Sequence, residues 1–515
     1  MLIHEYLQLN AERFPDKVAL KFGDGQLTYR DIDTQANRLA HALISAGLKR
    51  ADRVSIFLDN SPEAVIALYA VLKAGGVFST LSATLKSKKL EYILDNSGAS
   101  FLISHRQKGD IVAAAAAGCR TLKKVIMCGA ASDRPDHASG HGDAVAWDTF
   151  IADRPGTPPA ENNCIDIDLA NIVYTSGSTG NPKGVMMTHL NMASAASSII
   201  QYLENRASDV ILDVLPLSFD YGLYQVIMAF MFGGTIILEK SFAYPYVVID
   251  KLIKEKVTGF PIVPTILAIL LQLKNLDKYD FQHLRYISNT GAALPVHHIK
   301  QLRELFPRVK IYSMYGLTEC KRVSYLPPEE IDNRPASVGK GMPNEEVYIV
   351  NESGEKVGPG VVGELVVRGS NVMRGYWKSP ADTDRVLKDG PYPGEKVLYT
   401  GDLFRMDEEG YLYFVARKDD LIKTRGERVS PKEVENVLHE IEGVTEAAVI
   451  GVPDEILGNA VKAFIVSANE KRLQEKDIIR FCQDNLEAFM VPKYVVFVDS
   501  FAKTSSGKID KKLLK

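Results

Sequence analysis

Apolar residues from Thr28 to Phe78 form short continuous runs, separated by longer stretches in which they recur at helical spacing. This pattern predicts a strand, a helix, a strand, a helix and a final strand, with glycine ending the second helix. Further short β-branched runs occupy residues 99–104, 124–129, 171–176, 210–217 and 234–239. Strands that alternate with helices are typical of parallel sheets covered by helices, so the N-terminal part is expected to be α/β.

The pattern changes near residue 330, where short strands and tight turns replace the alternation. Residues 347–369 and 410–416 predict an antiparallel or barrel-like lobe. From Leu421 on, helices are expected at residues 429–441 and 475–486 and strands at 445–452 and 460–466. Ser430 and Pro431 open the first of these helices. The charged run at residues 417–423 suits an exposed joint, so a separate C-terminal α+β domain is expected after it.

Composition and charge narrow the classes of function. The chain has 515 residues, of which 46% are hydrophobic and 24% charged, so a folded protein of two or three lobes is expected. The net charge of -3 gives no overall attraction to nucleic acid or anionic membranes, and no nucleic-acid partner is expected. The longest uncharged run, Tyr221 to Leu238, contains Gln225 and a glycine pair, which favours a buried helix, a turn and a strand over a membrane span.

The N-terminal segment and the cysteines indicate a compartment. The first residues include acidic side chains and lack the basic and then apolar order of a secretory signal. The five cysteines are scattered and form no CxxC pair, which argues against a disulfide framework or a zinc site. A cytoplasmic protein is therefore expected.

The segment YTSGSTGNPKG, from Tyr174 to Gly184, carries the strongest chemical signal. Glycines let the backbone approach a ligand, and hydroxyls, backbone N–H groups and Lys183 together suit a polyphosphate. A plain turn would not need this many glycines and hydroxyls. The segment is not a Walker A loop, because Gly184 rather than Ser or Thr follows the lysine.

With this segment and several later motifs in order, the chain resembles the adenylate-forming superfamily of acyl-CoA synthetases, nonribosomal adenylation domains and luciferases over nearly its whole length. The later motifs are NTGAAL (Asn289 to Leu294), YGLTE (Tyr315 to Glu319), GELVVRG (Gly363 to Gly369), GYW (Gly375 to Trp377), YTGD (Tyr399 to Asp402), ARKDDLIKTRGERVSPKEVE (Ala416 to Glu435) and SSGKIDK (Ser505 to Lys511). The resemblance implies an α/β N-terminal domain at residues 1–416, made of two α/β subdomains and a small β-barrel-like lobe. It also implies a hinge at residues 417–420 and a mobile C-terminal α+β domain at residues 421–515.

The resemblance implies the reaction as well. A carboxylate attacks the α-phosphate of ATP to give acyl-AMP and pyrophosphate, and a thiol then attacks the acyl-AMP. Such chemistry depends on charge neutralisation more than on a strong base. The implied catalytic residues are Lys508, Glu319 and Thr318, and Glu319 is also the implied Mg²⁺ ligand. The implied phosphate-binding residues are Thr175, Ser176, Gly177, Ser178, Thr179, Gly180 and Lys183. Those implied for adenine and ribose are Gly291, Ala292, Ala293, Tyr315, Gly316, Asp402 and Arg417.

The same resemblance implies an acid pocket formed by Asp220, Tyr221, Tyr224, Pro261, Ser288, Thr290, Met314, Arg322 and Val323. In relatives that activate amino acids, an aspartate at the position of Asp220 pairs with the substrate ammonium, which favours an amino acid here. Other interpretations stay open: Asp220 caps a helix that begins at Tyr221, and Arg322 either selects a substrate with a polar or acidic side chain or pairs with Asp220 and neutralises it. The chain departs from the family pattern in FSTLSAT (Phe78 to Thr84) and in Cys320 and Lys321, so no single relative supplies the substrate.

The thiol acceptor follows from the same family likeness. Asp419 matches the hinge position, and Lys423 and Gly426 match the route by which a phosphopantetheine arm enters. Only seven residues follow Lys508, so a free-standing enzyme is expected, with a separate carrier protein or CoA as acceptor. An amino acid:carrier-protein ligase is the preferred hypothesis, a fatty or aryl acyl-CoA synthetase the alternative, and a non-catalytic nucleotide-binding protein a distant third. The oligomeric state stays open.

Overall fold

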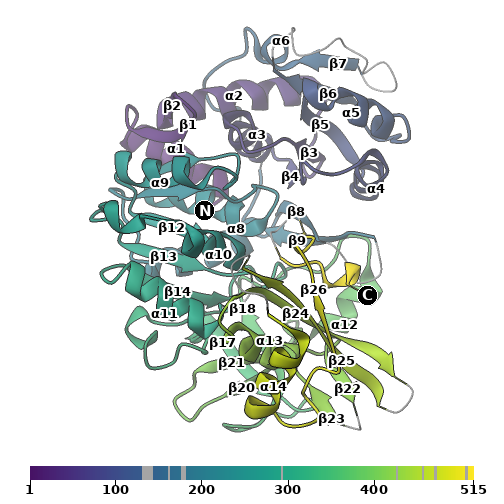
Figure 1. Ribbon diagram of the computed structural model, residues 1–515. Helices are drawn as coiled ribbons and strands as arrows, with labels where there is room; N and C mark the ends of the chain where they lie inside the picture. Colours follow the sequence, from purple (N-terminus) through teal and green to yellow (C-terminus); the bar gives the residue numbers. More distant parts are fainter. Residues whose placement is uncertain are drawn as a thin grey trace.

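The computed structural model describes residues 1–129, 143–160, 163–175, 181–291, 294–424, 427–454, 457–468, 473–504 and 508–514. A large N-terminal part carries two mainly parallel sheets and an antiparallel lobe, and a small C-terminal domain lies against it (Figure 1). The expected mixture of α/β and α+β regions is confirmed.

The first sheet has seven strands in the order β7-β6-β5-β3-β4-β8-β9. The expected alternation is present: β2 (Gly25–Thr28), α2 (Tyr29–Ser45), β3 (Arg53–Phe57), α3 (Pro62–Lys73) and β4 (Val77–Thr80) follow one another, but β2 pairs antiparallel with β1 in the second sheet, and only β3 and β4 belong to the first. The remaining strands are β5 (Ala99–His105), β6 (Lys124–Cys128), β7 (Asp143–Ala146), β8 (Leu169–Thr175) and β9 (Lys183–Thr188), with helices α4 (Ser87–Ser97), α5 (Gly109–Ala116) and α6 (Trp147–Ile151). Neighbouring strands are parallel except β8 and β9.

The second sheet has nine strands in the order β16-β15-β14-β13-β12-β10-β11-β1-β2. Its other strands are β1 (Val18–Phe22), β10 (Val210–Asp213), β11 (Thr235–Leu238), β12 (Gly259–Ile262), β13 (Tyr286–Asn289), β14 (Lys310–Tyr315), β15 (Ser324–Tyr325) and β16 (Lys340–Gly341). Its helices are α1 (Ile3–Arg13), α7 (His189–Tyr202), α8 (Asp220–Phe232), α9 (Pro245–Lys254), α10 (Pro264–Gln272) and α11 (Val296–Leu305). Strands β10 to β14 run parallel, so their carboxyl ends share one edge of the sheet.

Helix α8 lies in the apolar core that both sheets share. It is apolar on all sides and buried from Tyr221 to Phe230, as expected for an internal helix. Gly233, with φ of +75°, ends it in the left-handed conformation that glycine adopts without strain. The buried helix, glycine turn and strand expected for residues 221–238 are thus confirmed. No helix within the described residues is long and apolar enough to cross a bilayer.

The antiparallel lobe expected past residue 330 contains β17 (Glu345–Val350), β18 (Gly363–Gly369), β19 (Leu387–Asp389), β20 (Lys396–Met406) and β21 (Leu412–Arg417), with α12 (Pro380–Val386) beside them. All of its strand pairs are antiparallel. Short 3-10 turns lie at Arg106–Lys108, Leu276–Lys278 and Pro328–Glu330, and in the C-terminal domain at Lys511–Leu513.

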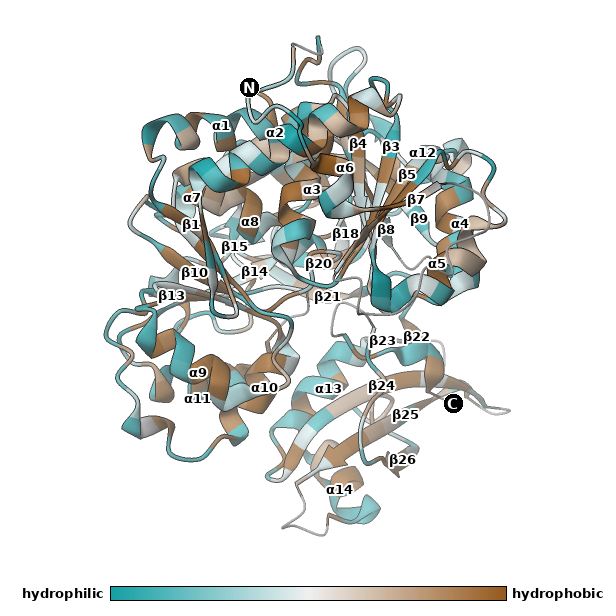
Figure 2. Ribbon diagram, turned by 90° about the horizontal axis from the view of Figure 1, so that it is seen from above, coloured by the Kyte–Doolittle hydropathy of each residue, from teal (hydrophilic) through white to brown (hydrophobic). Residues whose placement is uncertain are grey.

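The C-terminal domain has a separate apolar core, built around α13 (Pro431–His439), β24 (Val444–Asp454), β25 (Gly458–Ser467), α14 (Glu475–Asn485) and β26 (Tyr494–Phe497). The hairpin of β22 (Ile422–Thr424) and β23 (Glu427–Val429) precedes it. Ser430 caps α13 by accepting from the Glu433 N–H, and Pro431 takes the first helical position, as expected. Figure 2 shows the apolar strands β24 to β26 set apart from the N-terminal core, which agrees with an independent folding unit.

Candidate active site at the domain junction

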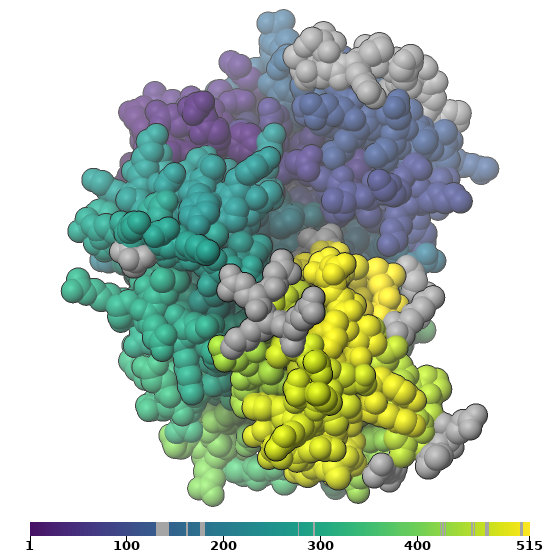
Figure 3. Space-filling model, viewed as in Figure 1, coloured from purple at the N-terminus to yellow at the C-terminus, as the bar shows by residue number. Residues whose placement is uncertain are grey.

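The predicted site residues come from three places that the fold brings together. Pro261 and Ser288 are register partners on β12 and β13, and Tyr315 ends β14, so all three lie toward the carboxyl edge of the second sheet. Asp402 and Arg417 are register partners in the antiparallel lobe. Lys508 comes from the C-terminal domain, which packs against the N-terminal part in Figure 3.

Asp402 is a buried carboxylate with two polar neighbours. Its side chain is 5% exposed, and Tyr315 Oη donates to its Oδ2 at 2.6 Å. Arg417 Nε lies 3.5 Å from its Oδ1. Burial raises the pKa of Asp402, while the positive charge of Arg417 acts in the opposite direction. The carboxylate is therefore fixed in position by groups from a different sheet and from the neighbouring strand.

Lys508 reaches into the same region. A Cβ added to Gly291 would lie 3.6 Å from Lys508 Cε, so the lysine side chain passes close to the glycine backbone. Thr504 and Lys508 hold the base of this segment, since Thr504 N–H donates to the Lys508 carbonyl at 2.8 Å and Lys508 N–H to Thr504 Oγ1 at 3.2 Å. Burial lowers the pKa of Lys508, and the positive Arg417 lowers it further. Asp220, Asp402 and Glu319 act in the opposite sense, so the negative charge of these three carboxylates favours the protonated lysine.

Tyr376 links Lys183 to Glu319: its ring contacts the lysine and its hydroxyl binds the glutamate. The segment of residues 374–377 pairs with the start of β9, where Trp377 N–H donates to the Gly184 carbonyl at 2.7 Å. This pairing sets the Tyr376 ring 5.5 Å from Lys183 Nζ. Tyr376 Oη donates to Glu319 Oε1 at 2.7 Å. Lys183 Nζ itself donates to Asp382 Oδ1 on α12 at 2.6 Å and lowers the pKa of that carboxyl.

The predicted acid-pocket positions are tightly packed. Tyr221 Oη lies 2.8 Å from Ser288 Oγ, and Tyr221, Tyr224 and Met314 are each 3% exposed or less. Thr290 and Val323 are also buried. The helix α8 begins at Asp220 itself, and Phe219 is its N-cap residue without a side-chain hydrogen bond. The alternative that Asp220 caps a helix beginning at Tyr221 is therefore wrong.

Asp220 has a cationic partner that the sequence did not reveal. Lys321 Nζ lies 3.4 Å from Asp220 Oδ2, donates to the Asp220 carbonyl and sits 4.2 Å from the Tyr224 ring. Lys321 is 3% exposed, and burial lowers its pKa to about 7 although Asp220 raises it. Its backbone is left-handed, with φ of +70°. In the sequence, the only sign that Lys321 is special was that Cys320 and Lys321 depart from the family pattern. That departure did not indicate that Lys321 pairs with Asp220.

Arg322 points elsewhere. Its guanidinium carbon lies 5.2 Å from the Tyr221 ring, and its side chain is 1% exposed. Within the part of the chain that the structure describes, its Nε and Nη1 are buried without a hydrogen-bond partner. Among the described residues, the ion-pair partner of Asp220 is Lys321 and not Arg322. The sequence-based alternative of an Asp220–Arg322 pair is therefore wrong.

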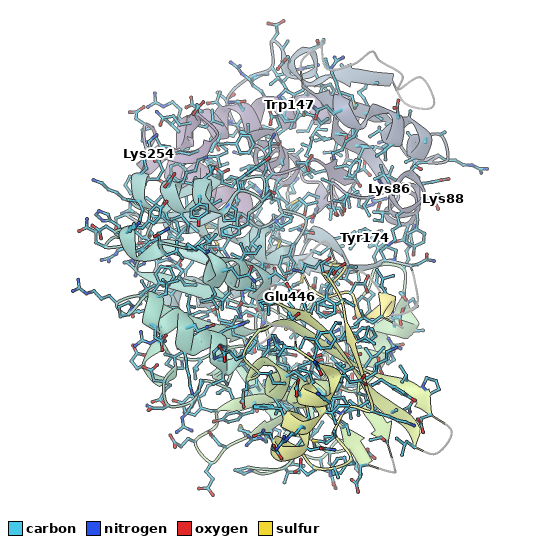
Figure 4. The ribbon with its side chains drawn as sticks, viewed as in Figure 1. Lys86, Lys88, Trp147, Tyr174, Lys254 and Glu446 are labelled. Carbon is cyan, nitrogen blue, oxygen red and sulfur yellow. The ribbon has the colours of Figure 1, made fainter. Side chains whose placement is uncertain are left out.

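A cleft of about 210 Å³ lies between the two domains. Val263, Pro264 and Gly291 line it on one side and His439, Glu446 and Lys508 on the other. Glu446, labelled in Figure 4, belongs to β24 at the edge of the C-terminal domain. The cleft therefore reaches Lys508 from the domain boundary.

Several predicted site residues lie outside the described residues: 176–180 of the phosphate segment, 292 and 293 near adenine, and 426 on the thiol route. Thr175 ends β8 and Lys183 begins β9, so these two strands flank the phosphate segment. Asp419 lies in the turn between β21 and β22, and Lys423 belongs to β22. Tyr376, Asp382 and Lys321 were not predicted as site residues.

Two family models match this chain. The AMP-binding enzyme model matches residues 7–377, and the AMP-binding enzyme C-terminal domain model matches residues 433–508. The chain belongs to the AMP-binding enzyme family. It is an AMP-forming ligase, and its expected superfamily is confirmed.

Relatives within the AMP-binding enzyme family include several ligases. A long-chain-fatty-acid–CoA ligase of Bacillus subtilis is 33% identical, over 97% of this chain and 91% of the relative. A feruloyl-CoA synthase of Amycolatopsis sp is 33% identical over 97% of this chain and 95% of its own. Tyrocidine synthase 1 of Brevibacillus parabrevis is 30% identical over 99% of this chain but only 44% of its own length.

Solved structures of AMP-binding enzymes share the whole fold. The anthranilate CoA ligase AuaEII in complex with anthranoyl-AMP has a TM-score of 0.90 at 27% identity, covering 100% of this chain and 96% of its own. ATP-bound MatB from Rhodopseudomonas palustris has a TM-score of 0.88 at 28% identity, and the match covers 100% of this chain and 98% of the MatB chain. The large N-terminal part and small C-terminal domain are therefore an arrangement common to these enzymes.

Proposed function

We propose that this AMP-forming ligase activates a carboxylic acid with ATP and transfers the acyl group to the pantetheine thiol of CoA. The observation that carries the proposal is the position of Lys508. A lysine from the C-terminal domain reaches Gly291, among the charges of Asp220, Glu319 and Asp402. A mobile cation at a buried anionic site is what phosphoryl chemistry needs as negative charge develops.

The residues present fit a bound adenosine triphosphate. Asp402 offers a buried carboxylate whose two oxygens can accept from the two ribose hydroxyls, with Arg417 and Tyr315 beside it. Gly291, with φ of +92°, leaves room beside Lys508 that a side chain would reduce. Lys183 and the segment of residues 175–180 would hold the β- and γ-phosphates. Tyr315, Gly316 and residues 291–293 would surround the adenine.

Glu319 suits one Mg²⁺ ion that is also bound by phosphate. Tyr376 occupies one carboxylate oxygen and leaves the other available. No group of three His, Cys, Asp or Glu side chains suited to a metal occurs within the described part of the chain. Mg²⁺ is commonly held by one or two carboxylates together with substrate phosphates, so a single glutamate is chemically sufficient. The ion would share the negative charge of the leaving pyrophosphate with Lys183.

Both steps balance without a further reactant. In the first, a carboxylate oxygen forms a bond to the α-phosphorus, the bond from that phosphorus to the bridging oxygen breaks, and pyrophosphate leaves. Lys508 would lie between the attacking carboxylate and the α-phosphate, and Thr318 beside them. In the second, the thiol gives its proton to water, sulfur bonds to the acyl carbon, the bond from that carbon to the phosphate oxygen breaks, and AMP leaves with the electron pair. Charge neutralisation suffices for the first step because phosphoryl transfer needs little covalent help.

The ion pair of Asp220 favours an acid without an ammonium group. An amino acid was expected because Asp220 could pair with the substrate ammonium, but Lys321 already neutralises this carboxylate. Displacing a buried cation would add a desolvation cost to ammonium binding. Relatives that act as CoA ligases also match along nearly their whole length. These observations support an acyl-CoA ligase over an amino acid:carrier-protein ligase.

Domain alternation would separate the two steps. We propose a hinge at residues 417–420, centred on Asp419, between residues 1–416 and 421–515. Lys508 serves the first step only, so rotation would withdraw it and bring Lys423 and Gly426 to the thiol route. The separate apolar core of the C-terminal domain supports rotation as a rigid body.

The test is ATP–pyrophosphate exchange in the presence of Mg²⁺, without thiol, across short and long aliphatic acids, aryl acids and amino acids. We expect exchange with non-amino acids, and a loss of about 100-fold or more in Lys508→Ala because the charge bridge is removed. Lys512→Ala, an exposed lysine in the same tail, is the matched control and should keep wild-type exchange. Wild-type exchange by Lys508→Ala, or exchange with amino acids alone, would contradict the proposal.

A further inference from the structure

A small cavity lies beside the Asp220–Lys321 pair, with a volume of about 10 Å³, enough for one water-sized group. Its polar lining comes from Asn171, Asp220, Tyr224, Thr318 and Lys321, and Val173, Met187 and Met192 line the rest. The proposed reaction assigns no role to Asn171 or to the hydroxyl of Tyr224. Its polar lining deep within an apolar core needs a physical explanation.

Two side chains of the lining have unused hydrogen-bonding atoms. Asn171 is 1% exposed on β8, and its Nδ2 and Oδ1 are both buried with no hydrogen-bond partner among the described residues. Tyr224 is 3% exposed, and its Oη likewise has none in that part of the chain. Each such atom is unfavourable compared with a satisfied one, because it has lost its hydration and gained no hydrogen bond. An apolar residue at position 171 would remove this cost, so the amide is best explained by a group that binds to it.

The charge of the cavity selects the kind of group. Lys321 and Asp220 form a pair with Nζ 3.4 Å from Oδ2, so the lining carries both signs side by side. A second carboxylate would be repelled by Asp220, and an ammonium by Lys321. A neutral group that both donates and accepts matches the free amide and the phenol. With room for one heavy atom, that group is a hydroxyl.

The cavity also adjoins the reacting centre. Thr318 immediately precedes Glu319 in the chain. Phe219, the neighbour of Asp220, approaches the same glycine as Lys508: a Cβ added to Gly291 would lie 3.7 Å from Phe219 Cζ and 3.6 Å from Lys508 Cε. The Tyr221 ring lies 5.7 Å from Lys321 Nζ, and both Tyr221 and its hydrogen-bond partner Ser288 are 2% exposed or less, so little space is left there. A hydroxyl bound here would therefore belong to a carbon near the carboxylate, and the acid would be short.

We propose that this cavity binds the hydroxyl of a short hydroxy acid and that Asn171, Tyr224 and Lys321 determine specificity for it. The inference rests on the proposed function and narrows its substrate class. Binding would give each of the free polar atoms a partner, whereas an acid lacking the hydroxyl would leave them unpaired. Sites built to bond a hydroxyl discriminate strongly for this reason.

The experiment compares matched acids in the exchange assay: lactate with propionate, and 2- and 3-hydroxybutyrate with butyrate. We expect at least one hydroxy acid to have a kcat/KM about tenfold or more above its deoxy partner. Tyr224→Phe, which removes only the phenolic oxygen, should lower this ratio by about tenfold, mainly through the hydroxy acid. Asn171→Leu should act in the same direction.

Tyr392→Phe is the matched control, because Tyr392 is 65% exposed and belongs to the antiparallel lobe. It should leave the ratio unchanged. Ratios near one for every pair would mean that the cavity holds only a structural water, and would overturn the inference. A Tyr224→Phe variant that keeps the wild-type ratio would also overturn it. Exchange with any non-amino acid would still support the proposed function, so the two failures are distinguishable.

Discussion

Lys321 combines three unusual properties in one residue. It is buried, it has a left-handed backbone, and its pKa is lowered to about 7. The left-handed turn directs the side chain toward Asp220 at the start of α8. A sequence motif locates Glu319, two residues earlier, but it does not specify the sign of φ at position 321. For this reason Glu319 could be predicted and the partner of Asp220 could not.

Removal of Lys321 alone should destabilise the protein more than removal of both partners. Lys321→Met leaves Asp220 as an uncompensated buried charge, and we expect a loss of about 3 kcal/mol in the free energy of unfolding of the N-terminal domain. Lys321→Met combined with Asp220→Asn should recover most of this loss. Urea denaturation followed by tryptophan fluorescence measures both.

The double variant decides between electrostatic and packing effects. If it is as unstable as Lys321→Met, the lysine stabilises by packing on Tyr224 rather than by pairing with Asp220.

At the scale of elements, the alternation of apolar runs was sufficient to predict the parallel sheets. It placed α3 and β4 correctly. The ends of α3 are also fixed locally, since Ser61 accepts from Ala64 N–H at its start and Gly75 follows its end. Hydrophobic patterning reflects residues that are close in the sequence, so it predicts elements whose ends are set by nearby residues. It could not predict that residues 374–377 pair with β9, since that pairing joins segments far apart in the chain. This contact is what brings Tyr376 to Glu319.

The loop after β14 leaves no room for a side chain at Gly316. A Cβ there would lie 2.5 Å from the Lys321 carbonyl oxygen and 2.9 Å from Arg322 Cα, both backbone atoms. Gly316→Ala should therefore displace the segment that carries Glu319 and Lys321, and reduce exchange activity by about tenfold or more. The measurement is exchange rate together with the urea midpoint.

Gly109→Ala is the control for that substitution. Gly109 begins α5, and an added Cβ would meet nothing within 4 Å. Since alanine favours a helix, this variant should be as stable as the wild type or slightly more so. Full activity in Gly316→Ala would mean that the loop can shift without moving the site residues.

At the scale of the whole molecule, two histidines meet across the domain boundary. His298 of α11 and His439 of α13 have ring centroids 5.4 Å apart, and both line the interdomain cleft. Burial lowers the pKa of His298 to about 4 and that of His439 to about 3. Lys432 and His297 lower these pKa values further, while Glu435 of α13 and Glu446 of β24 are carboxylates that line the same cleft. The contact therefore requires neutral rings.

Acid should weaken this arrangement of the domains. Separated rings would return toward the usual pKa of 6.5, so the docked form holds fewer protons, and docking is lost as pH falls from about 6.5 toward 4. We expect exchange to decline from pH 7 to 5.5, and to decline less in His298→Leu or His439→Leu. Parallel pH profiles for the wild type and both variants would contradict this prediction.

The pair between Lys183 and Asp382 has a consequence for how the nucleotide enters. Lys183 is proposed to bind the phosphates of ATP, but before ATP binds its Nζ already donates to the Asp382 carboxylate at 2.6 Å. Binding of ATP then exchanges one anion for another, because a phosphate takes the place of Asp382. Lys183 is paired with a negative charge both before and after ATP binds. Few ions would be taken from or released to the solvent in such an exchange. The affinity for ATP should accordingly depend only weakly on salt, and Asp382→Asn should make that dependence steeper.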